Sequence, residues 1–261
     1  MRHPIALVDA FADRPFRGNP AAVLLLDAPL PEGAMQDVAA EMAQAETAFA
    51  VACADGGWDL RWFTPTTEVP FCGHATLACA HLLHEEGRAQ GIVAFHTARM
   101  GVLRVGVEAG GYALDLPRLD PEPLGLAAVA ALAPGATEAF RSFENLFAVL
   151  PSETDVRAFA PDLAAIAALG SQGLCVTAPG EASDMASRYF APGAGIPEDA
   201  VTGSIHATLA PFWAARLGRD RLTAVQASRR GGRLGCHVTR DRVILTGRAV
   251  TTLRGHIEVP G

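Results

Sequence analysis

A partial internal repeat is the feature that most constrains how this chain can fold. The segment RWFTPTTEVPFCGHATLACAHLL begins at Arg61 and resembles SRYFAPGAGIPEDAVTGSIHATLAPFW, in which the matching arginine is Arg188. Each segment has an arginine, an aromatic residue, a phenylalanine, any residue and a proline. A loop with an acidic residue, a glycine and an apolar helix-like run follow. The glycines are Gly73 and Gly203, and the copies lie close to half the chain apart. Such repetition predicts two similar halves.

We expect the boundary between the halves in the proline- and alanine-rich stretch of residues 117–134, whose composition is typical of a linker. The halves are placed at residues 1–120 and 121–261, with the last strand free to return to the first half. Apolar and alternating runs predict strands in both halves. Helical spacing of apolar residues predicts helices over residues 34–43, 76–83 and 153–169 and in the apolar run after Ser204.

The composition excludes several classes of protein. All the basic residues are arginine, because the chain contains no lysine. Enzymes that use pyridoxal phosphate bind it through a lysine, and P-loop proteins need a lysine for the phosphates, so both classes are excluded. The net charge of −7, without a basic block, also argues against a nucleic-acid partner.

The apolar runs and the cysteines predict a soluble, cytoplasmic protein. The first residues, MRHPIALVDAFADRPF, reach Asp9 before a long apolar core forms, so they are not interpreted as a signal peptide. No apolar run approaches the roughly 18 residues of a membrane-spanning helix, and we expect no membrane partner. Five cysteines without close pairing argue against a disulfide framework.

Three histidines in the first copy of the repeat at first suggest a metal site. His74, His81 and His84 fall on one broad helical face, but the segment HLLHEE is not the His-Glu-x-x-His motif of metal-binding helices. A histidine near the end of a helix interacts favourably with the helix dipole. We therefore expect no metal site, and a structural role for the two later histidines.

Cys72 stands immediately before the first predicted helix, where the helix dipole favours a thiolate. Two thiols that face each other across a substrate would make a cofactor-free racemase. The second copy of the repeat has Thr202 at the matching position, so a matched thiol pair is absent. We prefer to interpret Cys72 as a small buried residue, and a thiol role stays open as the alternative.

Two short segments, Gly73-His74 and Gly203-Ser204, open the two apolar helices. The first backbone N–H groups of a helix have no partner within it, and such ends bind carboxylate or phosphate groups. Ordinary helix capping by Thr202 or Ser204 is the alternative, and it is compatible with anion binding.

Two carboxylates are candidates for proton transfer. Glu46 lies where a predicted helix gives way to the apolar strand TAFAV, and partial desolvation would suit it to acid–base catalysis. A solvated loop end is the commoner position of a glutamate. Asp199, in PEDAVTGS, lies near the second helix start and either orients His74 or a substrate amine, or serves as a turn residue.

Five segments together resemble the phenazine-biosynthesis PhzF-like family. They are VDAFADRPFRGNPAAV, QAETAFA, RWFTPTTEVPFCGHATLA, SRYFAPGAGIPEDAVTGSIHATLAPFW and ILTGRAV, in family order from residue 8 to 250. The resemblance implies an α+β fold related to that of diaminopimelate epimerase. Its two pseudo-symmetric halves would each be a β-barrel-like sheet around a central helix, with the active site in the cleft between them. It also implies a homodimer.

The family resemblance further implies a cofactor-independent isomerase of small carboxylate-bearing substrates. Glu46, in the ET motif, would be the acid–base that moves a proton along one face of the substrate. His74 and Asp199 would bind and polarise that substrate. The remaining residues implied at the site are Asn19, Gly73, Gly203 and Ser204, with the two glycines presenting N–H groups to the carboxylate.

The chain departs from the family pattern near the second helix. Ala200 replaces the usual proline of EDPVTGS, and Ile205 and Ala207 stand where the family often has alanine and cysteine. These differences leave the acid–base residues intact and bear on the substrate, so phenazine synthesis does not follow. Two alternatives stay open: an amino-acid racemase or epimerase that uses Cys72, and a non-catalytic ligand-binding or scaffold protein of the same fold.

Overall fold

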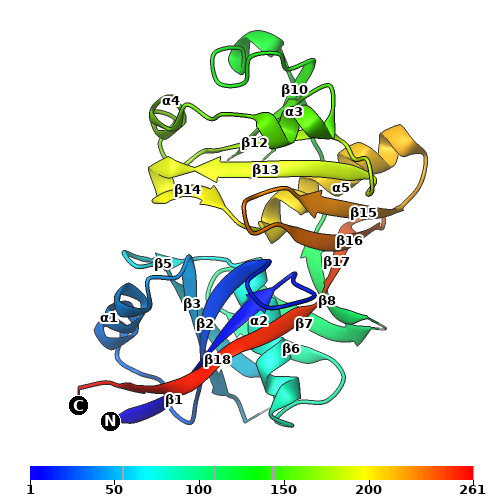
Figure 1. Ribbon diagram of the computed structural model, residues 1–261. Helices are drawn as coiled ribbons and strands as arrows, with labels where there is room; N and C mark the ends of the chain where they lie inside the picture. Colours follow the sequence, from blue (N-terminus) through cyan, green and yellow to red (C-terminus); the bar gives the residue numbers. More distant parts are fainter. Residues whose placement is uncertain (55, 109, 143–144, 261) are drawn as a thin grey trace. The chain divides into compact units, whose positions relative to one another are not determined.

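The computed structural model of the chain describes residues 1–54, 56–108, 110–142 and 145–260. Strands and helices mix throughout, so the fold is α+β as predicted. Two compact units, both drawn in Figure 1, divide the chain after Asp115 and again after Leu245, so the C-terminal segment belongs to the first unit. Within the described part of the chain, no helix is long and apolar enough to cross a membrane.

The first unit is a run of paired strands with two helices. Its strands are β1 (Arg2–Ala10), β2 (Asn19–Leu26), β3 (Glu46–Ala52), β4 (Trp58–Phe63), β5 (Glu68–Val69), β6 (Val93–Thr97), β7 (Gly101–Glu108), β8 (Gly111–Pro117), which leads out of the unit, and β18 (Ala249–Glu258). Its helices are α1 (Glu32–Met42) and α2 (Gly73–Glu85). The C-terminal strand β18 pairs antiparallel with β1, which joins the two ends of the chain in one unit.

The helix α2 is the buried element of the first unit. Ten of its thirteen residues are buried, and it contacts β1, β2, β3, β7 and β18. A helix that is apolar on nearly all sides needs to be enclosed, and the small residues of GHATLACA let the strands approach it closely. The helix begins at Gly73, three residues before the start that the apolar spacing predicts.

The second unit has the same kinds of elements. Its strands are β9 (Glu122–Leu124), β10 (Glu138–Ser142), β11 (Asn145–Val149), β12 (Gly173–Pro179), β13 (Met185–Ala191), β14 (Ile196–Asp199), β15 (Arg221–Gln226), β16 (Gly232–Val238) and β17 (Arg242–Gly247), which leads back to the first unit. Its helices are α3 (Glu153–Ala158), α4 (Leu163–Ala167) and α5 (Gly203–Leu217), with short 3-10 helices at η1 (Leu126–Ala128) and η2 (Pro192–Ala194).

The order of strand pairings is the same in both units. In the first, β1–β2 is antiparallel, β2–β3 parallel, β3–β4 antiparallel, β4–β6 parallel and β6–β7 antiparallel. In the second, β10–β11, β11–β12, β12–β13, β13–β15 and β15–β16 alternate in the same way. The short strands β5 and β14 each pair with the fourth strand of their series and lead into α2 and α5. The repeated sequence segments therefore occupy matching topological positions.

The repeated arginines make matching ion pairs. Arg61, on β4, donates from Nε to Oε1 of Glu68 at 2.7 Å and from Nη2 to Oε2 at 2.7 Å. Arg188, on β13, donates from Nε to Oε1 of Glu198 at 2.7 Å and from Nη2 to Oε2 at 3.1 Å. Each guanidinium thus binds a carboxylate of the neighbouring short strand in the two-pronged geometry that arginine favours. The acidic residue in each copy of the repeat is explained by this contact.

Two expectations about the second unit are corrected by the structure. The single helix predicted over residues 153–169 is two helices, α3 and α4, interrupted around Pro161. Proline disfavours helical backbone at the residue before it, and Asp162 then caps α4 by accepting from two backbone N–H groups at 3.0 and 3.1 Å. The stretch 117–134, predicted as a linker, contains β9, which pairs with β10.

Candidate active site

Strand pairing brings two of the predicted site residues to one edge of the first unit. Asn19 is the first residue of β2, and Glu46 is the first residue of β3. These strands are parallel, with Ala21 opposite Glu46, so the starts of both strands lie at the same edge. The N-terminal end of the buried helix α2 brings Cys72 and His74 to the same place.

The four side chains are in contact. Nε2 of His74 lies 3.3 Å from Oε2 of Glu46, and Nδ1 of the same ring lies 3.1 Å from Nδ2 of Asn19. Sγ of Cys72 lies 3.4 Å from Nδ1 of His74. All four residues are buried, with Glu46 the most exposed at 9 %. The predicted acid–base and the predicted polarising residue are therefore direct neighbours.

Burial keeps the His74 ring neutral. Removal from water disfavours the charged imidazolium and lowers the pKa of His74 from 6.5 to about 3. An amide nitrogen can only donate, so Nδ1 of His74 accepts from Asn19 and the ring proton resides on Nε2. Nε2 lies 3.3 Å from Oε2 of Glu46, but this buried oxygen accepts no hydrogen bond from the ring. The local arrangement is a buried carboxylate oxygen beside a neutral imidazole.

Cys72 occupies the N-cap position of α2 with an extended backbone, and its side chain makes no capping hydrogen bond. The sulfur contacts His74 instead. The side chain is buried, at 5 % exposure, as the interpretation of Cys72 as a small buried residue predicts. The contact with an imidazole means that Cys72 also belongs to the polar site. Cys72, Glu46 and His74 each offer an atom of a kind that binds metal ions, and these three atoms lie within 4.8 Å of one another.

The loop that precedes Asn19 is shaped by residues that the sequence did not single out. The buried carboxylate of Asp9 accepts the backbone N–H of Phe16 at 2.7 Å. Gly18 has a φ of +63°, and a Cβ there would lie 2.1 Å from the carbonyl oxygen of Ala10. The turn signal in FRGNP indicates a glycine turn, but nothing local indicates that a carboxylate anchors it.

The second unit holds the other predicted residues. Asp199 ends β14 and is buried, and its carboxylate accepts from Oγ1 of Thr202 at 2.5 Å. Gly203 is the first residue of α5, as predicted, and Ser204 follows it as a half-buried residue. Thr202 is the N-cap residue but makes no side-chain cap of this helix, because its hydroxyl donates to Asp199, and Ser204 lies within the first turn.

Gln226 completes this polar group and was missed by the sequence analysis. Its Oε1 accepts from the backbone N–H of Thr202 at 2.8 Å, and its Nε2 donates to the carbonyl oxygen of Asp199 at 2.9 Å. The side chain is fully buried on β15. A glutamine on a strand, far along the chain from its partners, carries no local signal of this role.

The later histidines of the first repeat take part in structural contacts. His81 lies between Tyr112 and Thr251, with its ring nitrogens 3.1 Å from each hydroxyl oxygen. Burial lowers its pKa, and the nearby Glu85 opposes that shift. His84 packs its ring against Tyr112. These contacts tie α2 to β8 and β18, in line with the structural role expected for both histidines.

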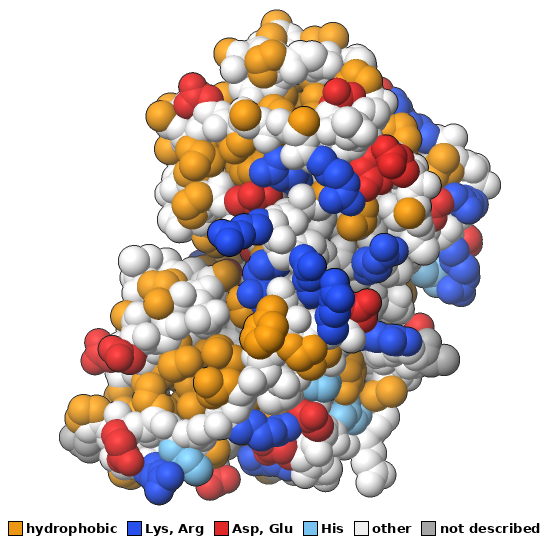
Figure 2. All heavy atoms as spheres, viewed as in Figure 1, with side chains coloured by type: hydrophobic (Ala, Val, Ile, Leu, Met, Phe, Trp, Pro, Cys, Tyr) orange, Lys and Arg blue, Asp and Glu red, His pale blue; other side chains and the backbone are white. Residues whose placement is uncertain are grey.

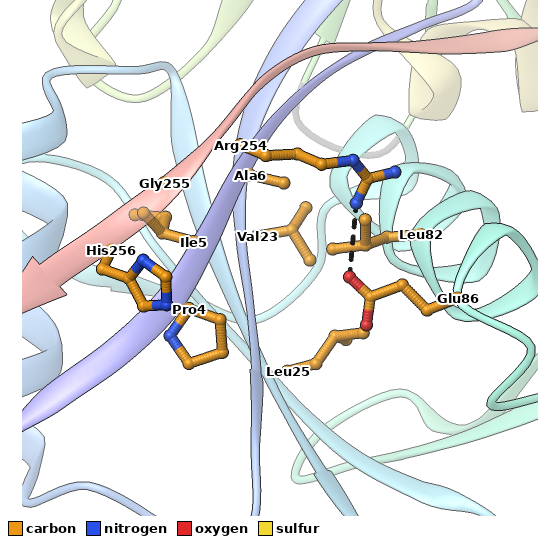
Figure 3. Close-up of a pocket in the computed structure, with 10 residues that line it drawn as sticks. All are labelled: Pro4, Ile5, Ala6, Val23, Leu25, Leu82, Glu86, Arg254, Gly255 and His256. Carbon is orange, nitrogen blue, oxygen red and sulfur yellow. Dashed lines mark hydrogen bonds and ion pairs between the residues drawn. The ribbon is translucent and has the colours of Figure 1, made fainter.

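A separate pocket of about 310 Å³ lies in the first unit, between β1, β2, β18 and α2 (Figure 3). Its walls are mostly apolar, and an ion pair of 3.3 Å between Arg254 and Glu86 crosses one side. None of the predicted site residues lines it. On the molecular face drawn in Figure 2, acidic side chains lie beside arginines in several places, as expected for a chain rich in arginine–carboxylate ion pairs.

Comparison with known proteins identifies extensive similarity. The family described as phenazine biosynthesis-like protein, PhzC-PhzF, matches residues 8–255. Two proteins of Pseudomonas aeruginosa, each named an uncharacterized isomerase, are 45 % and 44 % identical to the chain. The first alignment covers 97 % of both proteins, and the second covers 99 % of this chain and 100 % of its relative.

The similarity extends to solved structures. A crystal structure of a phenazine biosynthesis protein of the PhzF family from Enterococcus faecalis is 42 % identical and superimposes with a TM-score of 0.94. That comparison covers 99 % of this chain and 100 % of the other. The resemblance inferred from five sequence segments is thereby confirmed over nearly the whole chain.

Proposed function

The chain belongs to the family of phenazine biosynthesis-like proteins, and from this premise we propose that it is a cofactor-independent isomerase. Its substrate would be a small carboxylate-bearing molecule, cyclic or conjugated. Two close relatives carry the name isomerase, which supports the reaction class. The relatives' names specify no substrate, and the proposal therefore rests on the chemistry of the site.

The observation that carries the proposal is the contact between Glu46 and His74. A buried carboxylate has few water molecules to compete for a proton from carbon, which suits it to general base catalysis. The neutral imidazole beside it, at 3.3 Å, can donate a hydrogen bond without adding a positive charge. Such a donor would orient the carboxylate, and because it is neutral it would reduce the carboxylate's basicity less than a cation at the same place.

The proposed reaction is an internal proton transfer. The Glu46 carboxylate removes a proton from a carbon atom, and the electron pair of that C–H bond enters the conjugated system of the substrate. The carboxylic acid so formed then returns the proton to another carbon of the same system. Glu46 is ionised at the end of the reaction, as it was at the start, so the proposed reaction needs no external oxidant, reductant or cofactor.

The substrate carboxylate would be bound by backbone N–H groups at helix starts. Gly73 is the first residue of α2, and its first-turn N–H groups have no partner within the helix. In the second unit, we propose Asp199, Gly203 and Ser204 as further substrate-binding residues. Each can be tested by a single substitution whose main effect should be on KM. The predicted homodimer is tested by the mass of the protein in solution, measured by light scattering.

Substitution of Glu46 by glutamine tests the mechanism. The amide keeps the shape of the side chain and removes the base, so turnover should fall about 100- to 10,000-fold, the usual contribution of a general base. We would screen small unsaturated carboxylic acids in D2O and follow product formation and deuterium uptake by NMR. Glu41, exposed on α1, provides the matched control, and Glu41→Gln should leave turnover unchanged. Near-wild-type turnover in Glu46→Gln would exclude the mechanism.

The contact of Cys72 with His74 keeps a racemase as the second candidate function. A thiol base should exchange the α-hydrogen of a free amino acid with deuterium from solvent, and Cys72→Ser should abolish the exchange. Under the glutamate mechanism, Cys72→Ser keeps measurable isomerase activity. If neither isomerisation nor exchange occurs with any acid that binds, the protein is a ligand-binding member of the family.

A further inference from the structure

Three buried side chains at the candidate active site form a set that zinc favours. Glu46, Cys72 and His74 offer a carboxylate oxygen, a thiol sulfur and an imidazole nitrogen, all within 4.8 Å of one another. These are the three kinds of ligand that proteins use for Zn²⁺. The helical spacing of His74, His81 and His84 does not indicate this set, because Glu46 comes from a separate strand.

The distances between these atoms are close to those found around a tetrahedral ion. With zinc bonds of about 2.0–2.3 Å at tetrahedral angles, neighbouring ligand atoms lie about 3.3–3.7 Å apart. Nε2 of His74 lies 3.3 Å from Oε2 of Glu46 and 3.9 Å from Sγ of Cys72. Sγ lies closer to Nδ1, at 3.4 Å, than to Nε2, so the Cys72 side chain must turn to another rotamer to bind an ion held at Nε2.

The charges also balance. A thiolate and a carboxylate carry two negative charges, and a neutral imidazole adds none, so a bound Zn²⁺ leaves the buried site neutral overall. A neutral cluster avoids the large cost of burying an uncompensated charge. When the metal binds, the thiol of Cys72 forms the metal–sulfur bond and releases its proton to solvent.

We propose that Glu46, Cys72 and His74 bind a Zn²⁺ ion, with water as the fourth ligand, and that the bound ion blocks proton transfer by Glu46. The metal site stands on geometry alone. Its inhibitory effect rests on the proposed function, because a carboxylate that ligates a metal cannot accept a proton from carbon.

Metal binding would reverse the hydrogen bond between Asn19 and His74. Metal binding at Nε2 of His74 requires the ring proton to move to Nδ1, and the Asn19 amide must then turn its oxygen toward that proton. A carboxylate at this position would accept the proton better, since metal-bound histidines commonly donate to carboxylates. Asn19→Asp should therefore tighten metal binding, whereas Cys72→Ser should weaken it.

The test uses Co²⁺ as a spectroscopic substitute for Zn²⁺ in the full-length protein, with no substrate present. We expect one equivalent of Co²⁺ to produce the near-ultraviolet charge-transfer absorption of a cobalt–thiolate bond, and Zn²⁺ to displace it. Cys72→Ser should abolish the absorption, and Asn19→Asp should lower the Kd about 10-fold or more. Cys53→Ser is the matched control, because Cys53 is the cysteine of this unit that is not buried.

Each outcome decides the proposal. Absence of the absorption in the wild-type protein, its persistence in Cys72→Ser, or its loss in Cys53→Ser would overturn the metal site. Circular dichroism of each variant separates loss of metal binding from loss of folding. Asn19→Asp is expected to tighten metal binding, so its result cannot be explained by a variant that fails to fold. If Zn²⁺ binds but turnover is unchanged, the inhibitory effect is wrong while the site stands. Failure to find any turnover leaves the cobalt result intact.

Discussion

Nδ2 of Asn19 lies 3.1 Å from Nδ1 of His74, in a contact where both side chains are almost completely buried. The contact makes Nδ1 an acceptor and puts the ring proton on Nε2, next to Glu46. We predict that nitrogen-15 NMR of the metal-free protein will show His74 as the neutral Nε2–H form at pH 7. The measurement is a long-range proton–nitrogen correlation spectrum of protein labelled at histidine.

The same spectrum of Asn19→Ala provides the comparison. Without the amide donor, the Nδ1–H form should become populated, because the Cys72 sulfur can accept a hydrogen bond from it. His237, on β16 of the second unit, serves as an internal reference whose signals should not change. A single Nδ1–H form in the wild-type protein would contradict the assigned role of Asn19.

The two arginine–glutamate pairs should contribute unequally to stability. The side chain of Arg188 is 13 % exposed and also donates to the carbonyl oxygen of Phe159 at 2.7 Å, whereas that of Arg61 is 36 % exposed. We expect Arg188→Met to lower the free energy of unfolding by about 1.5–3 kcal/mol, the range for buried hydrogen bonds to charged groups. Arg61→Met should cost less than about 1 kcal/mol, as exposed ion pairs do.

Urea denaturation of both variants measures the difference. A double-mutant cycle with Glu198→Gln separates the ion pair from the other contacts of Arg188, and its coupling energy should be favourable. Equal losses in the two arginine variants would show that burial does not set the strength of these pairs.

Gly18 and Gly87 allow backbone strain and steric conflict to be separated. Both have positive φ angles, +63° and +69°, but a Cβ on Gly18 would lie 2.1 Å from the Ala10 carbonyl oxygen, while one on Gly87 would meet no atom within 4 Å. Gly87→Ala should cost about 1–2 kcal/mol, the strain of a left-handed alanine. Gly18→Ala should cost clearly more, because the backbone of β1 or the loop must move.

Thermal or urea denaturation measures the loss of stability in each variant, and the NMR signals of His74 report whether the loop before Asn19 has moved. A shift of the loop should displace Asn19 and alter the His74 nitrogen signals in Gly18→Ala, with no such change in Gly87→Ala. Similar stability losses in both variants would mean that the loop before Asn19 adapts without strain.

His206 should make the protein sensitive to acid. Its Nδ1 donates to the carbonyl oxygen of Thr202 at 2.7 Å, and the residue is fully buried. Burial lowers the pKa of His206 from 6.5 to about 4, against the opposing effect of that hydrogen bond. Between these pH values the unfolded chain binds a proton that the folded protein does not. This group alone therefore reduces stability as pH falls, by about 1.4 kcal/mol per pH unit once the unfolded residue is protonated.

Urea denaturation at pH 7 and at pH 5 measures this effect, and His206→Asn should reduce the difference between the two. Asparagine can still donate to the Thr202 carbonyl but does not titrate in this range. His256→Asn, at an exposed position, is the control and should leave the pH dependence as it is in the wild type. An unchanged pH dependence in His206→Asn would contradict the shifted pKa.

Much of the fold was predictable because its signals are local. The apolar runs that became β1, β2 and β3 are short stretches whose periodicity is visible in the sequence, and glycines or prolines mark many of their ends. The interruption at Pro161 is also a local effect, which the apolar spacing of residues 153–169 concealed. Buried helices such as α2 were identifiable because few other elements carry so many small apolar residues together.

The sequence alone determined the repeat, the family and the residue types at the site, since these follow from the order of residues. Only the tertiary structure decided which side chains meet. Asn19 reaches His74 because β2 and β3 pair in parallel beside α2, and Gln226 reaches Asp199 because β15 pairs beside β13. Such contacts join residues far apart in the chain, and their energies depend on how whole elements pack. No local pattern of residues encodes them.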